Sequence, residues 1–305
     1  MNTSTEHCIA KLLLWVSPAF MSSNYIIAKA ASGEVTPHLM ALIRWSVALS
    51  LMLVVSWKKL NSLLTLTSKE YLQILVLGAL GMWFCGAFVY EAAFSTSSTN
   101  IALIYAVTPV AIAGVGAREI SVKLLPRHWI GMVLALLGVL FVIFKGQVAN
   151  LSSTRLVIGD VWIVGAATSW VAYTILTKRW SSELSPSVRL CAVTAAGVLI
   201  LVPCTAIEAI HEGHLILTQR GIMLATIAGV VPGFLAYKAY AFLIQKIGPA
   251  QAGLVMYLSP VYAALIAWFL LDESPSWFHF AGAAMILPSI YLATAESHRI
   301  ELEYP

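Results

Sequence analysis

Apolar runs of about twenty residues follow one another along nearly the whole chain. A run of that length crosses the hydrocarbon core of a bilayer as a helix. Strands of a membrane barrel would alternate polar and apolar residues, whereas a run such as 134–144 is apolar on every face. We therefore predict an all-α membrane protein whose ten transmembrane helices span residues 9–29, 37–57, 71–93, 97–117, 127–145, 157–178, 187–208, 221–244, 249–271 and 277–295.

The composition excludes a soluble globule and offers little chemistry for an enzyme. Hydrophobic residues make up 60% of the chain and charged residues only 10%. The chain has no HExxH or GxSxG motif, and its two aspartates, Asp160 and Asp272, lie at predicted helix ends. The four cysteines show no CxxC spacing, which is typical of small buried hydrophobes. We predict a protein that is not an enzyme, with no cofactor and no metal site.

The same spacing of proline and glycine occurs twice. Pro109 and Gly131 are followed, 151 residues later, by Pro260 and Gly282. Repeated hydrophobic halves are typical of secondary transporters that bind substrate between the repeats. We expect an N-terminal tail, two five-helix repeats and a C-terminal tail, at residues 1–8, 9–148, 149–295 and 296–305. Because five is odd, the second repeat must be inverted in the membrane relative to the first.

The charges of the connecting segments predict the orientation. With the N-terminus in the cytoplasm, twelve lysines and arginines lie in inner segments and four in outer ones. This distribution follows the positive-inside rule, so both termini should be cytoplasmic. The formal net charge of +4 then reflects membrane insertion, since the basic residues are dispersed rather than clustered. No nucleic-acid partner is expected.

Several short segments resemble the EamA-type exporters of the drug/metabolite transporter superfamily. They are residues 22–29, 41–45, 167–174 and 257–260, the last leading to Leu271-Asp272-Glu273. The resemblance covers nearly the whole chain and implies two inverted five-helix repeats. It also implies a multi-pass protein of the plasma membrane, most often a bacterial inner membrane, that exports amino acids and related metabolites. In the first helix, Asn24 lacks the Trp-Gly-Ser that usually precedes it in the family.

Three charged residues in predicted spans need a reason for their burial, because a charge at the bilayer centre is costly. Arg44 is either a structural cation, which snorkels outward or bonds carbonyls of a neighbouring helix, or a clamp for a substrate carboxylate. Lys238 either snorkels to the inner surface or contacts an anionic group. Glu91 either lies at the outer interface or binds a substrate ammonium or a proton. Tyr90 directly precedes Glu91, and Tyr237 directly precedes Lys238.

Aromatic residues and prolines complete the candidate pathway. Trp170 and Tyr173 lie in mid-helix on one face, where they could line a cavity or simply pack. Tyr105 and Tyr257 each precede a repeat proline by about one turn. The proposed pathway thus contains Asn24, Arg44, Tyr90, Glu91, Tyr105, Trp170, Tyr173, Tyr237, Lys238 and Tyr257, with helix kinks at Pro109, Pro232 and Pro260.

These features favour an alternating-access secondary transporter that moves a small molecule outward, most naturally an amino acid or a related metabolite. Its partners are this substrate and the lipid bilayer, with a proton as a candidate coupling ion; facilitated diffusion is the alternative. A drug-efflux or metabolite-uptake permease on the same fold is a second hypothesis. A sensor or membrane enzyme would need a soluble segment or a catalytic pair, which the sequence lacks. The residues do not specify an oligomeric state.

Overall fold

The computed structural model describes residues 3–96, 101, 104–120, 126–147, 157–180, 182–253, 256–259, 261–262, 265–266 and 276–294. Their regular structure is helical, apart from one isolated bridge between Val35 and Leu217. Uninterrupted helices are α1 (Thr3–Ala31), α2 (Pro37–Ser56), α6 (Thr108–Ile120), α7 (Pro126–Ile143), α8 (Ile158–Arg179), α9 (Pro186–Glu212) and α13 (Trp277–Thr294). A 3-10 helix, Trp57–Thr65, extends α2.

Two further helices each contain a π-helical turn. The first consists of α3 (Ser68–Gly78), the π turn Ala79–Phe84 and α4 (Cys85–Ser95). The second consists of α10 (Gln219–Ala228), the π turn Gly229–Leu235 and α11 (Ala236–Gly253). The threonine caps that begin these helices, Thr67 and Thr218, are 151 residues apart, as are the first glycines at the two π turns, Gly78 and Gly229. The spacing that the prolines and glycines show in the sequence therefore recurs in helix caps and in helix irregularities.

Helices cover each of the ten predicted spans in whole or in part, as far as the chain is described. Within the span 97–117 the described residues include a turn at Ala106 and Val107. Six of the described helices are long and apolar enough to cross a membrane by length and composition alone: Pro37–Thr65, Ser68–Ser95, Pro126–Ile143, Ile158–Arg179, Pro186–Glu212 and Gln219–Pro249.

Two of the predicted proline kinks are described, and they differ. The chain turns at Ala106 and Val107, so Pro109 lies in the first turn of α6 rather than inside a continuous helix. A proline there sacrifices no hydrogen bond, because amides of the first turn have no helical partner. Pro232 lies inside the second π turn, as an interruption within its helix. Pro260 lies outside the described residues.

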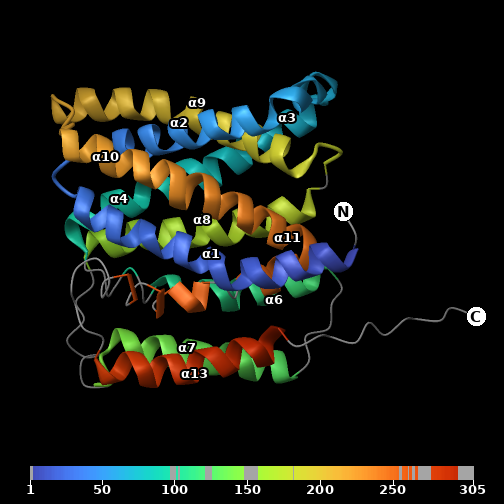
Figure 1. Ribbon diagram of the computed structural model, residues 1–305. Coiled ribbons are helices and arrows are strands. Elements are labelled where there is room, and N and C mark those ends of the chain that lie inside the picture. The colour runs from blue at the N-terminus through green and yellow to red at the C-terminus, as the bar shows by residue number, and fades with distance from the viewer. Residues whose placement is uncertain are drawn as a thin grey trace, which may run out of the picture.

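The helices form a bundle of layers, with α2 and α9 along one edge and α7 and α13 along the opposite edge (Figure 1). Helices α1, α8 and α11 lie between these edges. Figure 1 also shows α1 beginning and α13 ending at the same end of the bundle, as expected if both termini lie on one side of a membrane. The largest group of buried apolar side chains fills the space among α1, α2, α4, α8, α9 and α11.

The two halves pack against each other reciprocally at glycines. A Cβ atom on Gly78 would lie 2.7 Å from the backbone nitrogen of Gly197 in α9, so the third helix approaches the seventh backbone to backbone. A Cβ on Gly229 would lie 2.6 Å from the carbonyl oxygen of Arg44, so the eighth helix approaches the second in the same way. Small residues permit such close helix contacts in membranes. Each half thus uses an equivalent glycine to contact the other half.

Candidate functional site

A central cavity of about 50 Å³ brings together six of the residues singled out in the sequence. Helices from both halves contribute to it. Its walls are formed by Met21, Asn24, Tyr25, Arg44, Cys85, Val89, Tyr105, Trp170, Pro232, Tyr237 and Met256. Since one water needs about 10–15 Å³ on this measure, the cavity has room for only a few water molecules. It is a small space lined by residues of both halves.

Arg44 supplies the positive charge of this cavity from the middle of α2. Its side chain is buried, with 3% of its surface exposed. Nη1 donates to the Tyr90 hydroxyl at 3.1 Å, and Nη2 donates to the Pro232 carbonyl oxygen at 3.2 Å. The Tyr90 hydroxyl in turn donates to Asn24 Oδ1 at 3.0 Å. A chain of hydrogen bonds therefore links the charge on α2 to α4 and α1.

No acid among the described residues neutralises the charge of Arg44. Among the residues that the structure describes, no carboxylate lies within 4 Å of its guanidinium, and Nε has no hydrogen-bond partner. A buried charge is costly unless it is paired. The Trp45 ring, 4.6 Å from the guanidinium carbon, offers only the weaker attraction of a π face. Within the part of the chain that the structure describes, the cavity thus contains a cation without a protein anion.

The π turns explain why backbone carbonyls are available to side chains at this depth. A π turn shifts the helical hydrogen-bond ladder by one residue, so a carbonyl in the turn can accept a side-chain donor. The Pro232 carbonyl accepts from Arg44, and the Gly81 carbonyl accepts from the Tyr237 hydroxyl at 2.8 Å. Gly81 and Pro232 are 151 residues apart, so equivalent carbonyls of the two halves each receive a side-chain donor from elsewhere in the bundle.

Trp170 forms an aromatic wall of the cavity. Its ring stacks on Tyr240 with centroids 4.8 Å apart and on Tyr173 at 5.7 Å, and it meets Tyr237 edge-on at 5.5 Å. The indole Nε1 has no hydrogen-bond partner, although the side chain is only 3% exposed. Trp170 therefore contributes an aromatic surface to the cavity that Arg44 also lines, and its indole N–H is buried without a partner among the described residues.

Four predicted pathway residues lie elsewhere. Tyr173 packs against Gly81, where a Cβ atom would lie 2.8 Å from its ring, and it supports Trp170 rather than lining the cavity. Lys238 is exposed, with Nζ 5.4 Å from the Phe234 ring centroid, as expected of a snorkelling side chain. Tyr257 is fully buried in a separate apolar cluster. Glu91 belongs to a different group of polar residues at one end of the bundle.

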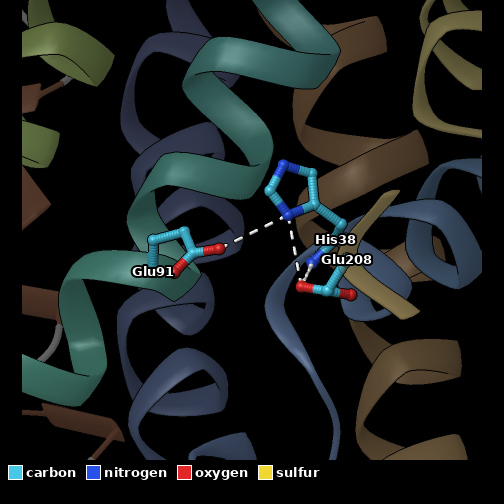
Figure 2. A group of neighbouring side chains, drawn as sticks. All are labelled: His38, Glu91 and Glu208. Atoms are coloured by element: carbon cyan, nitrogen blue, oxygen red, sulfur yellow. Dashed lines mark hydrogen bonds and ion pairs between the residues drawn. The ribbon is translucent and has the colours of Figure 1, made fainter. Parts of the chain in front are cut away.

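That group consists of His38, Glu91 and Glu208 (Figure 2). His38 Nδ1 lies 3.3 Å from Glu91 Oε1 and 3.2 Å from Glu208 Oε1. Glu208 also accepts the backbone amides of His38 at 2.9 Å and Leu39 at 3.1 Å, so its carboxylate caps the first turn of α2. A cavity of about 500 Å³ adjoins the three side chains.

Some cavity residues were not singled out from the sequence. Met21 and Tyr25 lie one turn apart on α1 beside Asn24, so the helical period could have indicated them. Cys85 was interpreted as a small hydrophobe, and in the structure its Sγ lies 3.7 Å from the Tyr105 hydroxyl. His38 and Glu208 are 170 residues apart, and no local pattern relates them.

Comparisons with known proteins identify the chain's relatives. The model of the EamA-like transporter family matches twice, at residues 9–144 and 157–295. An uncharacterized transporter of Archaeoglobus fulgidus is 23% identical over 98% of this chain and 100% of its own length. The uncharacterized transporter YyaM of Bacillus subtilis is 22% identical over 95% of this chain and 94% of its own. The uncharacterized inner membrane transporter YedA of Escherichia coli is 22% identical over 89% of this chain and 86% of its own.

A solved crystal structure of a protein has the same fold. It superposes with a TM-score of 0.74 at 17% sequence identity, over 93% of this chain and 97% of the other. The double match of the family suggests an internal repeat, in agreement with the spacing of caps, glycines and π turns. The chain is a multi-pass integral membrane protein.

Proposed function

The chain belongs to the EamA-like transporter family, and from that premise we propose that it exports small zwitterionic metabolites, amino acids foremost, across the plasma membrane. Its substrate site is the central cavity around Arg44 and Trp170. The two repeats, 9–148 and 149–295, rock about this site so that it opens to one side at a time.

The observation that carries this proposal is the uncompensated charge of Arg44. A substrate carboxylate would supply the missing anion and would accept from donors that have no partner, Arg44 Nε and Trp170 Nε1. A guanidinium binds a carboxylate in a two-pronged geometry that fixes the orientation of the substrate. An anionic group is therefore the part of the substrate that this cavity selects most strongly.

The remaining walls favour an amino acid with an apolar or aromatic side chain. Trp170, Tyr105 and Tyr237 present ring surfaces, and Met21 and Met256 are flexible enough to fit different side chains. Asn24 Oδ1 accepts one bond, from Tyr90, and an amide oxygen can accept two. Its second lone pair is available to a substrate ammonium.

The size and position of the cavity support alternating access. Residues of α1, α2 and α4 line one side and residues of α8 and α11 line the other, so relative motion of the halves would open it. At about 50 Å³ it must widen before it can admit an amino acid. Inverted repeats provide two equivalent ways of opening, one toward each face of the membrane. The reciprocal contacts of Gly78 and Gly229 support that relation.

The test is counterflow in proteoliposomes against a panel of amino acids, drugs and other metabolites, with and without a proton gradient. Arg44→Lys keeps the charge but loses the planar, two-pronged donor geometry of the guanidinium. We expect KM for the transported amino acid to rise at least about tenfold. Trp170→Ala should also raise KM. Lys238→Ala is the control, since Lys238 lies on the exposed surface, and it should leave transport per folded protein unchanged.

Each result has a defined consequence. Unchanged KM in both cavity variants would refute the site. Exchange of lipophilic cations instead of amino acids would favour the drug-efflux alternative. Accumulation of the substrate inside cells that express the protein would favour uptake. Stimulation by a proton gradient would identify antiport, whereas equal rates with and without it would identify facilitated diffusion.

A further inference from the structure

The cavity beside His38, at one end of the bundle, is much larger than the central cavity. Its volume is about 500 Å³, ten times that of the central cavity. Three histidines and three glutamates contribute to its walls: His38, Glu91, Glu208, His211, Glu212 and His214. In a chain with only 10% charged residues, this concentration of carboxylates and imidazoles needs a reason.

From this cluster we propose that His38, Glu91 and Glu208 form a binding site for one divalent transition-metal ion, with Zn²⁺ as the representative. Imidazole and carboxylate together suit such ions, and Zn²⁺ binds both at about 2.0–2.2 Å. The site joins α2, α4 and α9, and so connects the two halves of the protein. It is distinct from the substrate cavity.

Two of the three distances between ligand atoms match those of a tetrahedral ion. With metal bonds of about 2.05 Å, neighbouring ligand atoms of a tetrahedral site are about 3.3 Å apart. His38 Nδ1 lies 3.3 Å from Glu91 Oε1 and 3.2 Å from Glu208 Oε1. All three ligand atoms lie within 4.8 Å of one another. A point equidistant from them is then at most about 2.4 Å from each, which a small side-chain adjustment brings to the zinc range.

The carboxylates can accept an ion without losing the contacts that hold the fold. Glu208 Oε1 accepts the amide of His38 and retains a second lone pair, while Oε2 accepts the amide of Leu39. Glu91 lies opposite and forms an ion pair with His38. Figure 2 shows both carboxylates directed at the same imidazole nitrogen, from two different helices.

Two further observations point to a ligand in this cavity. Thr36 lines it with 7% of its surface exposed, and its hydroxyl has no hydrogen-bond partner among the described residues. His211 and His214 line the same cavity and provide candidate fourth ligands. Without a metal, a proton on His38 Nδ1 must bridge the two carboxylates, so metal and proton compete for this position.

The sequence predicted no metal site, because the three ligands come from helices far apart in the chain. His38 is 53 residues from Glu91 and 170 residues from Glu208, so no ligand spacing is visible. Only packing of α2 between α4 and α9 brings them together.

The experiment is calorimetric titration of the purified full-length protein with Zn²⁺, after removal of any polyhistidine tag. We expect one high-affinity site, weaker binding at lower pH and no comparable binding of Mg²⁺. His38→Ala and Glu91→Gln should each weaken Zn²⁺ binding at least about tenfold, because even outer-shell partners of a metal are worth that much. Glu91→Gln leaves the cap that Glu208 forms on α2 in place, and thermal unfolding of the variant checks that it is folded.

His279→Ala is the matched control. His279 lies at the start of α13, in the same predicted outer region, and does not line the cavity. The His279→Ala variant should bind Zn²⁺ as tightly as the unmodified protein does. Equal binding in all variants, absence of binding in the unmodified protein, or equal binding of Mg²⁺ would each overturn the proposal. This measurement needs no transported substrate, so its outcome is independent of the proposed export.

Discussion

Gly229→Ala is the substitution whose effect the structure specifies most closely. A Cβ atom there would lie 2.6 Å from the carbonyl oxygen of Arg44 and 2.6 Å from Cβ of Val47. One of these contacts is with backbone, so the helices themselves must separate. The displaced turn of α2 is the one that carries Arg44. The substitution therefore tests both the packing of the halves and the position of the proposed carboxylate clamp.

The magnitude follows from two opposing effects. Replacing glycine by alanine in a helix gains about 0.8–1.0 kcal/mol of intrinsic stability. Overpacking a tight contact costs about 1–3 kcal/mol. The net effect is between about zero and 2 kcal/mol of destabilisation. Gly165→Ala is the matched control, because its Cβ would lie 3.4 Å from Cδ2 of Phe88, which is an ordinary contact. Only the gain in helix propensity therefore applies to it.

The assay is thermal unfolding of both purified variants in the same detergent, combined with transport per folded protein. The intrinsic gain largely cancels between them, so Gly165→Ala should unfold about 2–10 °C above Gly229→Ala. Transport should fall in Gly229→Ala and be retained in Gly165→Ala. If Gly229→Ala is as stable as Gly165→Ala, the eighth and second helices are not in backbone contact and the reasoning is refuted.

Two further predictions concern the hydrogen-bond chain and the topology. Tyr90→Phe leaves a donor of Arg44 and an acceptor of Asn24 unpaired. Each hydrogen bond between helices of a membrane protein contributes about 0.6–1.7 kcal/mol, so the substitution should lower the free energy of unfolding by about 1–3 kcal/mol. Thermal unfolding in detergent measures this loss, and an unchanged midpoint would show that water replaces the hydroxyl. Cysteines placed at Lys58 and His211 should react with an impermeant thiol reagent from the inside and the outside of the membrane, respectively. Labelling of both from one side would contradict the predicted orientation.

The fold was largely predictable because bilayer and backbone chemistry allow few solutions. Apart from the turn at Ala106 and Val107, the described parts of the long apolar runs are helical almost throughout, as the need to satisfy backbone groups within a helix requires. The break near Pro109 was harder to predict, since proline is compatible both with a kink and with a helix start. The π turns have only a partial signal, the Pro232-Gly233 pair in the second one. The equivalent first turn contains no proline.

The candidate site was predictable where one helix determines a residue's position and less so where neighbours do. Arg44 had to be buried by its depth in a span, and the structure brings it to the cavity. Trp170 and Tyr173 share a helix face, yet only Trp170 lines the cavity, because the π turn at Gly81 covers Tyr173. Helical spacing identifies a face, and packing against another helix decides which part of that face remains open.

Helix α2 links the central cavity to the proposed metal site. Arg44 follows His38 by six residues, which is about 9 Å along a helix. The first turn of α2 is held by Glu208 of α9, and the middle of α2 packs against Gly229 of the second π turn. Both of these contacts cross from one half of the protein to the other. Any motion that opens the central cavity by separating α2 from α9 must therefore also separate His38 from Glu208. A metal ion bound between them would resist that motion, so Zn²⁺ should slow transport in the unmodified protein and should slow it less in Glu91→Gln, whose cap on α2 is intact.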